Sequence, residues 1–327
     1  MEISIIMPVY NETVLLKRSI SSVIRQTFTN WELIIVDDGS AEAVIKICQE
    51  YVGKDSRIRL FHQKHSGQAA ARNRGLSMAE GRYVAFMDAD DYMHPRMLEQ
   101  LYQDIVTTNT RIAVCGFKRF RQLPQISVCE LCKPKIIKVS GDSKNVRHAT
   151  IKDNVYLWNK LYQRSLFEHI KFKNGRFYED LAVMHKLFAE AGIISYNRNV
   201  LYFYYQNPAG TIQTLDEKKI ADYIWAYEQR IKYYYYEKYE TDLEHVTHAF
   251  LYKAYELYMT NRVKEETSKK KIKKKLRKCV NNVFKQYELV QYLPFHGKIR
   301  YWAFIGCPPV FEAELWCRKW YKRFLRN

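Results

Sequence analysis

The first hundred residues alternate short apolar runs with segments of helical spacing, and this alternation limits the fold more than any other feature of the chain. Runs such as ISIIMPV predict strands that are buried on both faces. We expect strands at 3–9, 31–36, 57–62 and 82–87, and helices at 13–26, 43–52, 68–80 and from Pro95 to about Thr107. Strands and helices in this order predict an α/β fold, a doubly wound and mostly parallel sheet with helices on both faces.

Polar clusters follow three of these strands. Tyr10 and Glu12 follow the first strand, Asp38 lies in a tight turn after the second, and 88–91 follows the fourth. Ligands of doubly wound sheets bind beyond the carboxyl ends of the strands, so we expect one site there. The chain contains neither a GxGxxG dinucleotide fingerprint nor a P-loop.

Asp88 and Asp90 place two carboxylates at positions i and i+2 at the end of a strand. Carboxylates this close repel each other unless a cation lies between them, and hard oxygen ligands suit Mg²⁺ or Mn²⁺. A lone DxD is more often only a turn and helix cap before a residue such as Pro95. The strand before it and the two companion loops favour a metal site.

Other candidates allow two interpretations each. Asp38 could accept a hydrogen bond from a nucleotide base or cap the following helix, and Tyr10 could stack on a base. Arg72 and its neighbours could face a pyrophosphate or lie on a solvated helix face. The Glu179-Asp180 pair could supply a general base or simply stabilise the N-terminus of the helix expected at 181–191.

Charge and composition limit the functional classes to which the protein can belong. The net charge is +18, and hydrophobic residues make up 47% of the chain, enough for a core. A basic chain suits a nucleic-acid binder, a protein on an anionic membrane or an enzyme with anionic substrates. Nucleic acid fits poorly, because acidic loops repel phosphate without a metal. We expect a cytoplasmic protein with free thiols, since the chain starts on a strand-like run and shows no disulfide framework.

The segment 216–327 is helical in pattern, rich in Tyr, and carries most of the excess positive charge. At 313–325, Trp316, Trp320 and Phe324 recur at helical spacing beside basic residues. This pattern is typical of a helix that lies in a membrane interface, and we expect peripheral attachment to the inner face of the cell membrane. The alternative is an amphipathic helix packed on the catalytic domain.

The chain resembles glycosyltransferase family 2, the inverting transferases of GT-A fold, over roughly residues 1–210. The matching segments are IIMPVYNE at 5–12, QTFTNWELIIVDDGS at 26–40, GQAAARNRG at 67–75, GRYVAFMDADDY at 81–92, WNKLY at 158–162 and YEDL at 178–181. The nearest look-alikes are bacterial enzymes that assemble capsular, exopolysaccharide, teichoic-acid or lipopolysaccharide glycans. A sugar-nucleotide nucleotidyltransferase is the enzyme rival, but the glycine-rich phosphate loop it needs is missing.

The resemblance implies a nucleotide-sugar donor, most often a UDP-sugar, a divalent Mn²⁺ or Mg²⁺, and a glycan or polyprenyl-diphosphate-linked oligosaccharide acceptor. A homo-oligomer is possible. The parts implied are 1–110 for the nucleotide sugar, 111–215 for the acceptor and catalytic base, and a basic, aromatic-rich 216–327. The donor-binding residues implied are Pro8, Tyr10, Glu12, Asp38, Arg72, Asn73, Asp88 and Ala89. Asp90 and Asp88 match the metal ligands, Asp180 the catalytic base and Glu179 its neighbour, and Trp158 and Lys160 the acceptor side.

Overall fold

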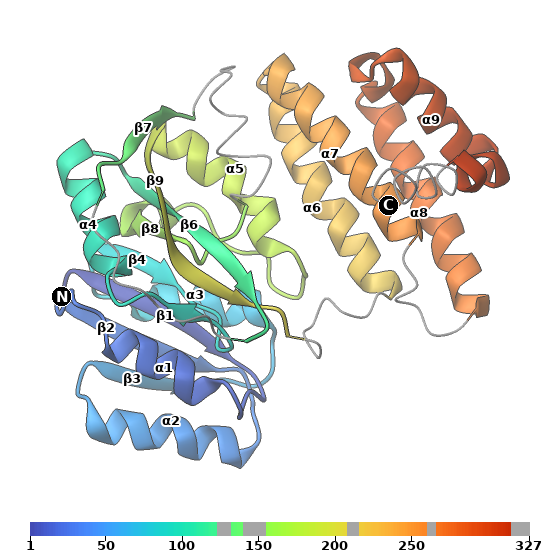
Figure 1. The fold of residues 1–327 in the computed structure, drawn as a ribbon. Helices are drawn as coiled ribbons and strands as arrows, with labels where there is room; N and C mark the ends of the chain where they lie inside the picture. Colours follow the sequence, from blue (N-terminus) through green and yellow to red (C-terminus); the bar gives the residue numbers. More distant parts are fainter. Residues whose placement is uncertain (123–131, 140–154, 208–215, 260–265, 315–327) are drawn as a thin grey trace, which may run out of the picture. The chain divides into compact units, whose positions relative to one another are not determined.

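The computed structural model describes residues 1–122, 132–139, 155–207, 216–259 and 266–314. The chain divides into two compact units, Met1–Thr211 and Ile212–Asn327 (Figure 1). This division lies close to the change of composition at residue 215. No helix in the described part of the chain is long and apolar enough to cross a membrane.

In the described residues of the first unit, a nine-stranded sheet forms the centre (Figure 1). Its order is β3-β2-β1-β4-β8-β6-β9-β5, and β7 pairs with β9. The strands are β1 (Ile3–Val9), β2 (Trp31–Asp37), β3 (Ile58–His62), β4 (Tyr83–Phe86), β5 (Tyr92–Met93), β6 (Ile112–Phe120), β7 (Lys135–Lys138), β8 (Lys160–Gln163) and β9 (Ile193–Tyr205). The helices are α1 (Leu16–Ile24), α2 (Glu42–Lys54), α3 (Gln68–Met78), α4 (Met97–Thr108) and α5 (Glu179–Ala191).

The first four strands are parallel, as predicted. β1 pairs with β2 on one side and with β4 on the other, and β2 pairs with β3. The chain therefore winds outward in one direction through β2 and β3 and returns to place β4 on the opposite side of β1. This reversal is a topological switch point, the place where open α/β sheets bind ligands. The carboxyl ends of β1, β2 and β4 all lie at that edge.

Apolar cores cover both faces of the sheet. One core joins Ile3, Ile5 and Met7 of β1 to buried residues of α1 and α4, and the other joins Ile6 to α3 and α5. Neighbouring residues of β1 thus face opposite cores, which explains why this strand is apolar at nearly every position. The predicted α/β class, with helices on both faces of the sheet, is confirmed.

Beyond β4 the sheet is mixed. β8 is antiparallel to β4 and to β6, while β6 and β9 are parallel. The WNKLY segment at 158–162 leads into β8, which a 3₁₀ helix at Arg164–Phe167 follows, and β9 extends over Ile193–Tyr205. Polar residues at intermediate positions of β9 hide its length from a search for apolar runs.

The second unit consists of helices throughout its described residues, as predicted for the C-terminal region. They are α6 (Glu217–Tyr236), α7 (Glu240–Met259), α8 (Glu266–Gln286), a 3₁₀ helix at Leu289–Tyr292 and α9 (Phe295–Gly306), and residues 308–314 are helical as well. Aromatic residues form much of its core: Phe250 stacks on Tyr227, and Phe304 packs against Tyr255 and Tyr258. The tail helix expected at 313–325 falls almost wholly on 315–327, outside the described residues.

Candidate active site

Three loops meet at the edge of the sheet where β1, β2 and β4 end. The backbone N–H of Asp38 donates to the carbonyl of Val9 at 2.9 Å. Asn11, which has a φ of 51°, accepts a hydrogen bond from the Ala41 N–H through its side chain and donates its own N–H to the Ser40 hydroxyl. The left-handed conformation is one that Asn tolerates better than most residues. The loops after β1 and β2 are therefore fixed to each other.

Asp38 is buried, and its carboxylate holds the loop between β3 and α3. It accepts hydrogen bonds from the backbone N–H groups of Ser66 and Gly67, both at 2.8 Å, and from the Gln63 amide at 2.7 Å. The ring of His65 lies on the same side, 2.9 Å from the carboxylate. The side chain of Asp38 thus positions the loop that leads into α3.

Tyr10 and His65 form an exposed aromatic pair at this edge. Their ring centroids lie 4.2 Å apart with an interplanar angle of 26°, and the Tyr10 side chain is 51% exposed. A stacked pair with a free face is suited to receive a flat aromatic group such as a nucleotide base. His65 was not among the residues singled out from the sequence, because only the fold brings it beside Tyr10.

Arg72 connects the loop after β4 to the start of α5. It is buried, and it donates to Asp88 at 3.0 Å and to Glu179 in a close ion pair. Gly75, one turn later, faces Ile6 of β1 so closely that a Cβ would clash with it. A glycine there lets α3 lie against the sheet, and this brings Arg72 to the edge. Gln68 also donates to Asp88, at 3.0 Å.

Asp90 and Asp91 differ sharply although they are neighbours. Asp91 is fully buried and accepts hydrogen bonds from the Tyr202 hydroxyl at 2.6 Å and from the Tyr205 N–H at 2.7 Å, so it fastens the loop to β9. The carboxylate of Asp90 accepts a longer bond from Asn207, at 3.2 Å. Burial, and then the negative charge of Asp88, raise the pKa of Asp90 to about 6. A cation near Asp90 would therefore stabilise its charged carboxylate.

Asp88 and Asp90 could supply some, but not all, of the ligands of a divalent metal ion. The described residues contain no group of three or more His, Cys, Asp or Glu side chains that could hold a metal ion. Mg²⁺ and Mn²⁺, however, are commonly held by one or two carboxylates together with water and substrate phosphates. The pair of carboxylates, with the raised pKa of Asp90, has this chemistry.

Glu179 and Asp180 open α5, whose N-terminal residue lies against Arg72. Tyr178, the residue before the helix, has a φ of 60°. Burial raises the pKa of Glu179 to about 7, although the charge of Arg72 works against this rise. Burial likewise raises the pKa of Asp180, against the opposing effect of Arg72 and of the Leu181 N–H, which donates to its carboxylate at 2.7 Å. A carboxylate with a raised pKa is suited to accept a proton near neutral pH.

Comparison with known proteins identifies the family. Residues 4–128 match the family model "Glycosyl transferase family 2". Glycosyltransferase GlyG of Streptococcus pneumoniae is 30% identical over 224 residues, which are 65% of this chain and 73% of GlyG. The chain is a family 2 glycosyltransferase.

Two solved structures share the fold of this glycosyltransferase. TarS 1–349 of S. aureus, crystallised in complex with UDP-GlcNAc, superposes with a TM-score of 0.66 at 19% identity, over 86% of this chain and 83% of that one. The mannosyltransferase PcManGT of Pyrobaculum calidifontis, in complex with GDP-Man and Mn²⁺, superposes with a TM-score of 0.50 at 12% identity, over 89% and 74% of the two chains. At these identities the likeness concerns the GT-A-like fold.

Several residues expected to touch the donor have structural contacts in this glycosyltransferase. Pro8 lies inside β1 and is buried, and Glu12 accepts hydrogen bonds from the backbone N–H groups of Val14 and Leu15 at the start of α1. The side chain of Asn73 binds Phe172 and Asn174, not the edge of the sheet. Ala89 is 9% exposed. Of the residues named from the sequence, the structure brings Arg72, Asp88 and Glu179 into direct contact.

Trp158 and Lys160 lie beneath the surface of the glycosyltransferase. Trp158 is 4% exposed and stacks on Tyr202, with ring centroids 4.5 Å apart. Lys160 is fully buried, and its ammonium group donates to the Tyr156 carbonyl and to the Asn159 side chain. Burial lowers the pKa of Lys160 to about 7. Trp158 and Lys160 of the WNK segment therefore belong to the buried layer under the candidate active site.

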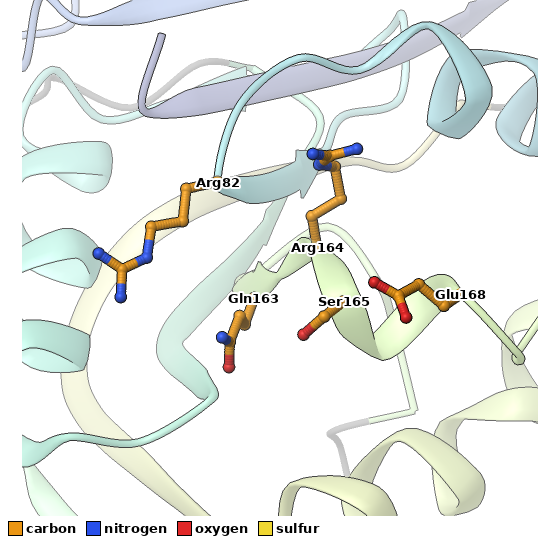
Figure 2. A pocket seen from close by; sticks show the side chains of 5 residues that line it. All are labelled: Arg82, Gln163, Arg164, Ser165 and Glu168. Atoms are coloured by element: carbon orange, nitrogen blue, oxygen red, sulfur yellow. The ribbon is translucent and has the colours of Figure 1, made fainter.

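A separate hollow lies at the other edge of the sheet. Its volume is about 200 Å³, and Figure 2 shows its lining residues, which are Arg82, Gln163, Arg164, Ser165 and Glu168. Arg82 directly precedes β4, and β8, which ends at Gln163, is antiparallel to β4. The hollow is therefore at the amino end of the parallel strands, away from the candidate active site.

Proposed function

We propose that this glycosyltransferase transfers a sugar from a UDP-sugar to a hydroxyl group of a glycan or lipid-linked oligosaccharide, with inversion at the anomeric carbon. The observation that carries the proposal is the contact of Asp88 with the buried ion pair of Arg72 and Glu179, with Asp180 next in the chain. It joins the carboxylates at the end of β4 to a carboxylate of raised pKa at the start of α5. The UDP-GlcNAc in the TarS complex supports the choice of a uridine donor.

The donor would lie across the switch point of the sheet. The base would stack on the exposed pair Tyr10 and His65, and Asp38 would act by holding the loop that carries His65. The diphosphate would then lie toward Asp88 and Asp90. These two carboxylates would hold Mn²⁺ or Mg²⁺, which neutralises the charge of a diphosphate leaving group.

Asp180 would remove the proton of the acceptor hydroxyl. The acceptor oxygen forms a new bond to the anomeric carbon from the side opposite the diphosphate. The bond from that carbon to the diphosphate breaks, and its electron pair leaves with UDP. The proton remains on Asp180, and the configuration of the sugar is inverted. Arg72 holds Glu179 and Asp88 in place during these steps.

We propose bacterial surface polysaccharide synthesis as the setting, with the acceptor carried on a membrane lipid and the enzyme on the cytoplasmic side. The basic character of the second unit supports this location, because a lipid-linked acceptor lies at an anionic membrane surface. The experiment that tests the function is a donor screen. Purified protein with Mn²⁺ is offered UDP-, GDP- and TDP-sugars, and slow hydrolysis of each is followed.

We expect hydrolysis of one or more UDP-sugars and a marked decrease on removal of Mn²⁺ with a chelator. The Asp90→Ala variant serves as the control for a contaminating enzyme, since it should lose the activity while it remains folded. Hydrolysis of GDP-sugars alone would contradict the uridine donor. Retention of the anomeric configuration in a transfer product would contradict the role given to Asp180.

A further inference from the structure

One side of α9 exposes a row of apolar residues. Phe295 is 80% exposed, Ile299 54% and Trp302 58%. The spacing from 295 to 299 and 302 places these side chains on one side of the helix, and exposed Gly306 continues the row. Among the exposed residues between 294 and 313 none is Asp, Glu, Lys or Arg. We call Phe295, Ile299 and Trp302 the apolar row.

The apolar row is not needed to hold α9 in place. Other residues of the helix pack on the core of the second unit: Phe304, opposite the row, contacts Tyr255 and Tyr258, and Tyr301 stacks on Phe284 with ring centroids 4.4 Å apart. Tyr301 and Phe304 are almost completely buried. A helix with one buried apolar side and a second, exposed one has more apolar surface than its own fold requires.

A row of lysines lies on the neighbouring helix. Lys274, Lys278 and Lys285 of α8 are exposed, and within the described part of the chain no acidic group pairs with them. Other lysines of α8 do have partners, as Lys275 does with Glu217 and Lys273 with Glu312. We call Lys274, Lys278 and Lys285 the lysine row.

The apolar row and the lysine row face the same side of the helical unit. Contacts of α8 with α9 and with the residues after α9 run antiparallel: Phe284 meets Tyr301, Arg277 meets the Ile305 carbonyl, and Lys273 meets Glu312 beyond the end of α9. A helix turns by about 100° per residue. The lysine row therefore lies roughly a quarter turn around α8 from the residues of α8 that contact α9. The apolar row lies roughly a quarter turn, in the same rotational sense, around α9 from the residues of α9 that contact α8. Because the helices are antiparallel, both quarter turns lead to the same side. Figure 1 shows α8 and α9 next to each other.

We propose that this side of α8 and α9 is the surface by which the protein lies on an anionic lipid bilayer. The apolar row enters the interface between lipid headgroups and chains, where Trp and Phe are favoured, and the lysine row meets the lipid phosphates. This surface would provide the membrane location that is part of the proposed function. Membrane binding depends on neither the donor nor the reaction, so the protein could fail to bind vesicles and still transfer sugar.

Charge complementarity favours the bilayer over other occupants. In a symmetric dimer formed through the apolar row, the lysine rows of both copies would lie at one interface and repel each other. The segment 315–327 carries Arg318, Lys319, Lys322, Arg323 and Arg326, so it would bring further positive charge beside the lysine row. An anionic bilayer neutralises the lysines and covers the apolar row together.

The test is sedimentation of the full chain with vesicles of phosphatidylcholine alone and of phosphatidylcholine with 30% phosphatidylglycerol. We expect binding to the anionic vesicles and little binding to the neutral ones. The double variant Ile299→Asp, Trp302→Asp should bind at least about tenfold more weakly. The triple variant with Lys274, Lys278 and Lys285 each changed to Glu should lose binding to a similar degree, because each lysine near an anionic surface contributes to attraction.

Matched controls come from the same unit. Tyr252 is 71% exposed on α7, and Lys232 is exposed on α6, so Tyr252→Asp and Lys232→Glu change equally exposed residues outside the proposed surface. Both should bind vesicles like the unchanged protein. All variants should keep the hydrolysis of UDP-sugar, which separates loss of membrane binding from loss of fold.

Three results would overturn the proposal. One is equal binding of the unchanged protein and the double variant to anionic vesicles. Another is a stable dimer by light scattering that the double variant abolishes, with no vesicle binding, which would assign the apolar row to a second copy. The third is vesicle binding only after residues 315–327 are deleted, which would assign the row to that segment.

Discussion

Arg72 and Glu179 lie 107 residues apart in the chain and form a buried ion pair, in which Nη1 of Arg72 donates to Oε1 of Glu179. The other terminal nitrogen of Arg72 reaches Asp88 at 3.0 Å. One guanidinium group therefore connects the loop that follows β4 to the helix that carries Asp180. Burial alone would disfavour the charge of Arg72, but Glu179, and then Asp88, raise its pKa.

Replacement of Arg72 should destabilise the fold. In Arg72→Met, Glu179 is left buried beside Asp180 without its cation, and breaking a buried pair in this way costs about 3–5 kcal/mol. Urea unfolding at pH 7.5 measures the change. The double variant Arg72→Met, Glu179→Gln should recover part of the loss, because no uncompensated Glu179 charge remains. A double variant less stable than Arg72→Met would show that the pair does not account for the effect.

Asp180→Asn should abolish most of the turnover and leave the fold intact. Loss of a general base lowers rates by about 10² to 10⁴-fold, whereas an amide of the same shape can still accept the Leu181 N–H bond. Transfer rate and donor binding are measured separately, and binding should change little. Glu190→Gln, in the last turn of the same helix, is the control, and its turnover should be near normal. Near-normal turnover of Asp180→Asn would remove Asp180 as the base.

The pH dependence of transfer should follow the carboxylates at the start of α5. Asp180 acts as a base only when it is deprotonated, so kcat/KM should rise with pH and fall as pH decreases through its pKa. Burial raises that pKa, so the decrease should begin above the ordinary Asp value of about 3.9. Glu179→Gln removes a neighbouring negative charge and should move the decrease to lower pH. An unchanged profile in this variant would contradict the coupling of the two groups.

Asp90 should contribute more to metal binding than an equally perturbed carboxylate elsewhere. Asp90→Asn should weaken Mn²⁺ binding in the presence of UDP by at least about tenfold, because a neutral amide is a poor ligand for a hard cation. Isothermal titration with Mn²⁺ provides the measurement. Asp104 of α4 is a suitable control, since burial raises its pKa to about 6 as well, but it bonds to Gln100 and Asn197. If Asp104→Asn has the same effect, the metal does not depend on Asp90 specifically.

The sequence was sufficient to predict the parallel half of the sheet and its helices. Its strands are apolar on both faces, and the apolar residues of its helices recur at helical spacing. The elements from β1 to β4 can therefore be predicted without tertiary information. The mixed half was harder to predict, because buried and exposed residues follow no regular period in β9 and because β8 has only four residues. The surface for the membrane was expected on the tail at 313–325, whereas the exposed apolar row of the described residues lies on α9.

What the sequence determined by itself is the set of chemical groups and the edge of the sheet where they gather. Strand polarity fixes that edge, and the carboxylates at positions 88, 90, 179 and 180 are visible as motifs. Only the tertiary structure decided the role of each group, because burial and partners are set by segments far apart in the chain. It turned Asp38 and Asp91 into anchors for loops, placed Lys160 beneath the site, and joined Arg72 to Glu179 across 107 residues.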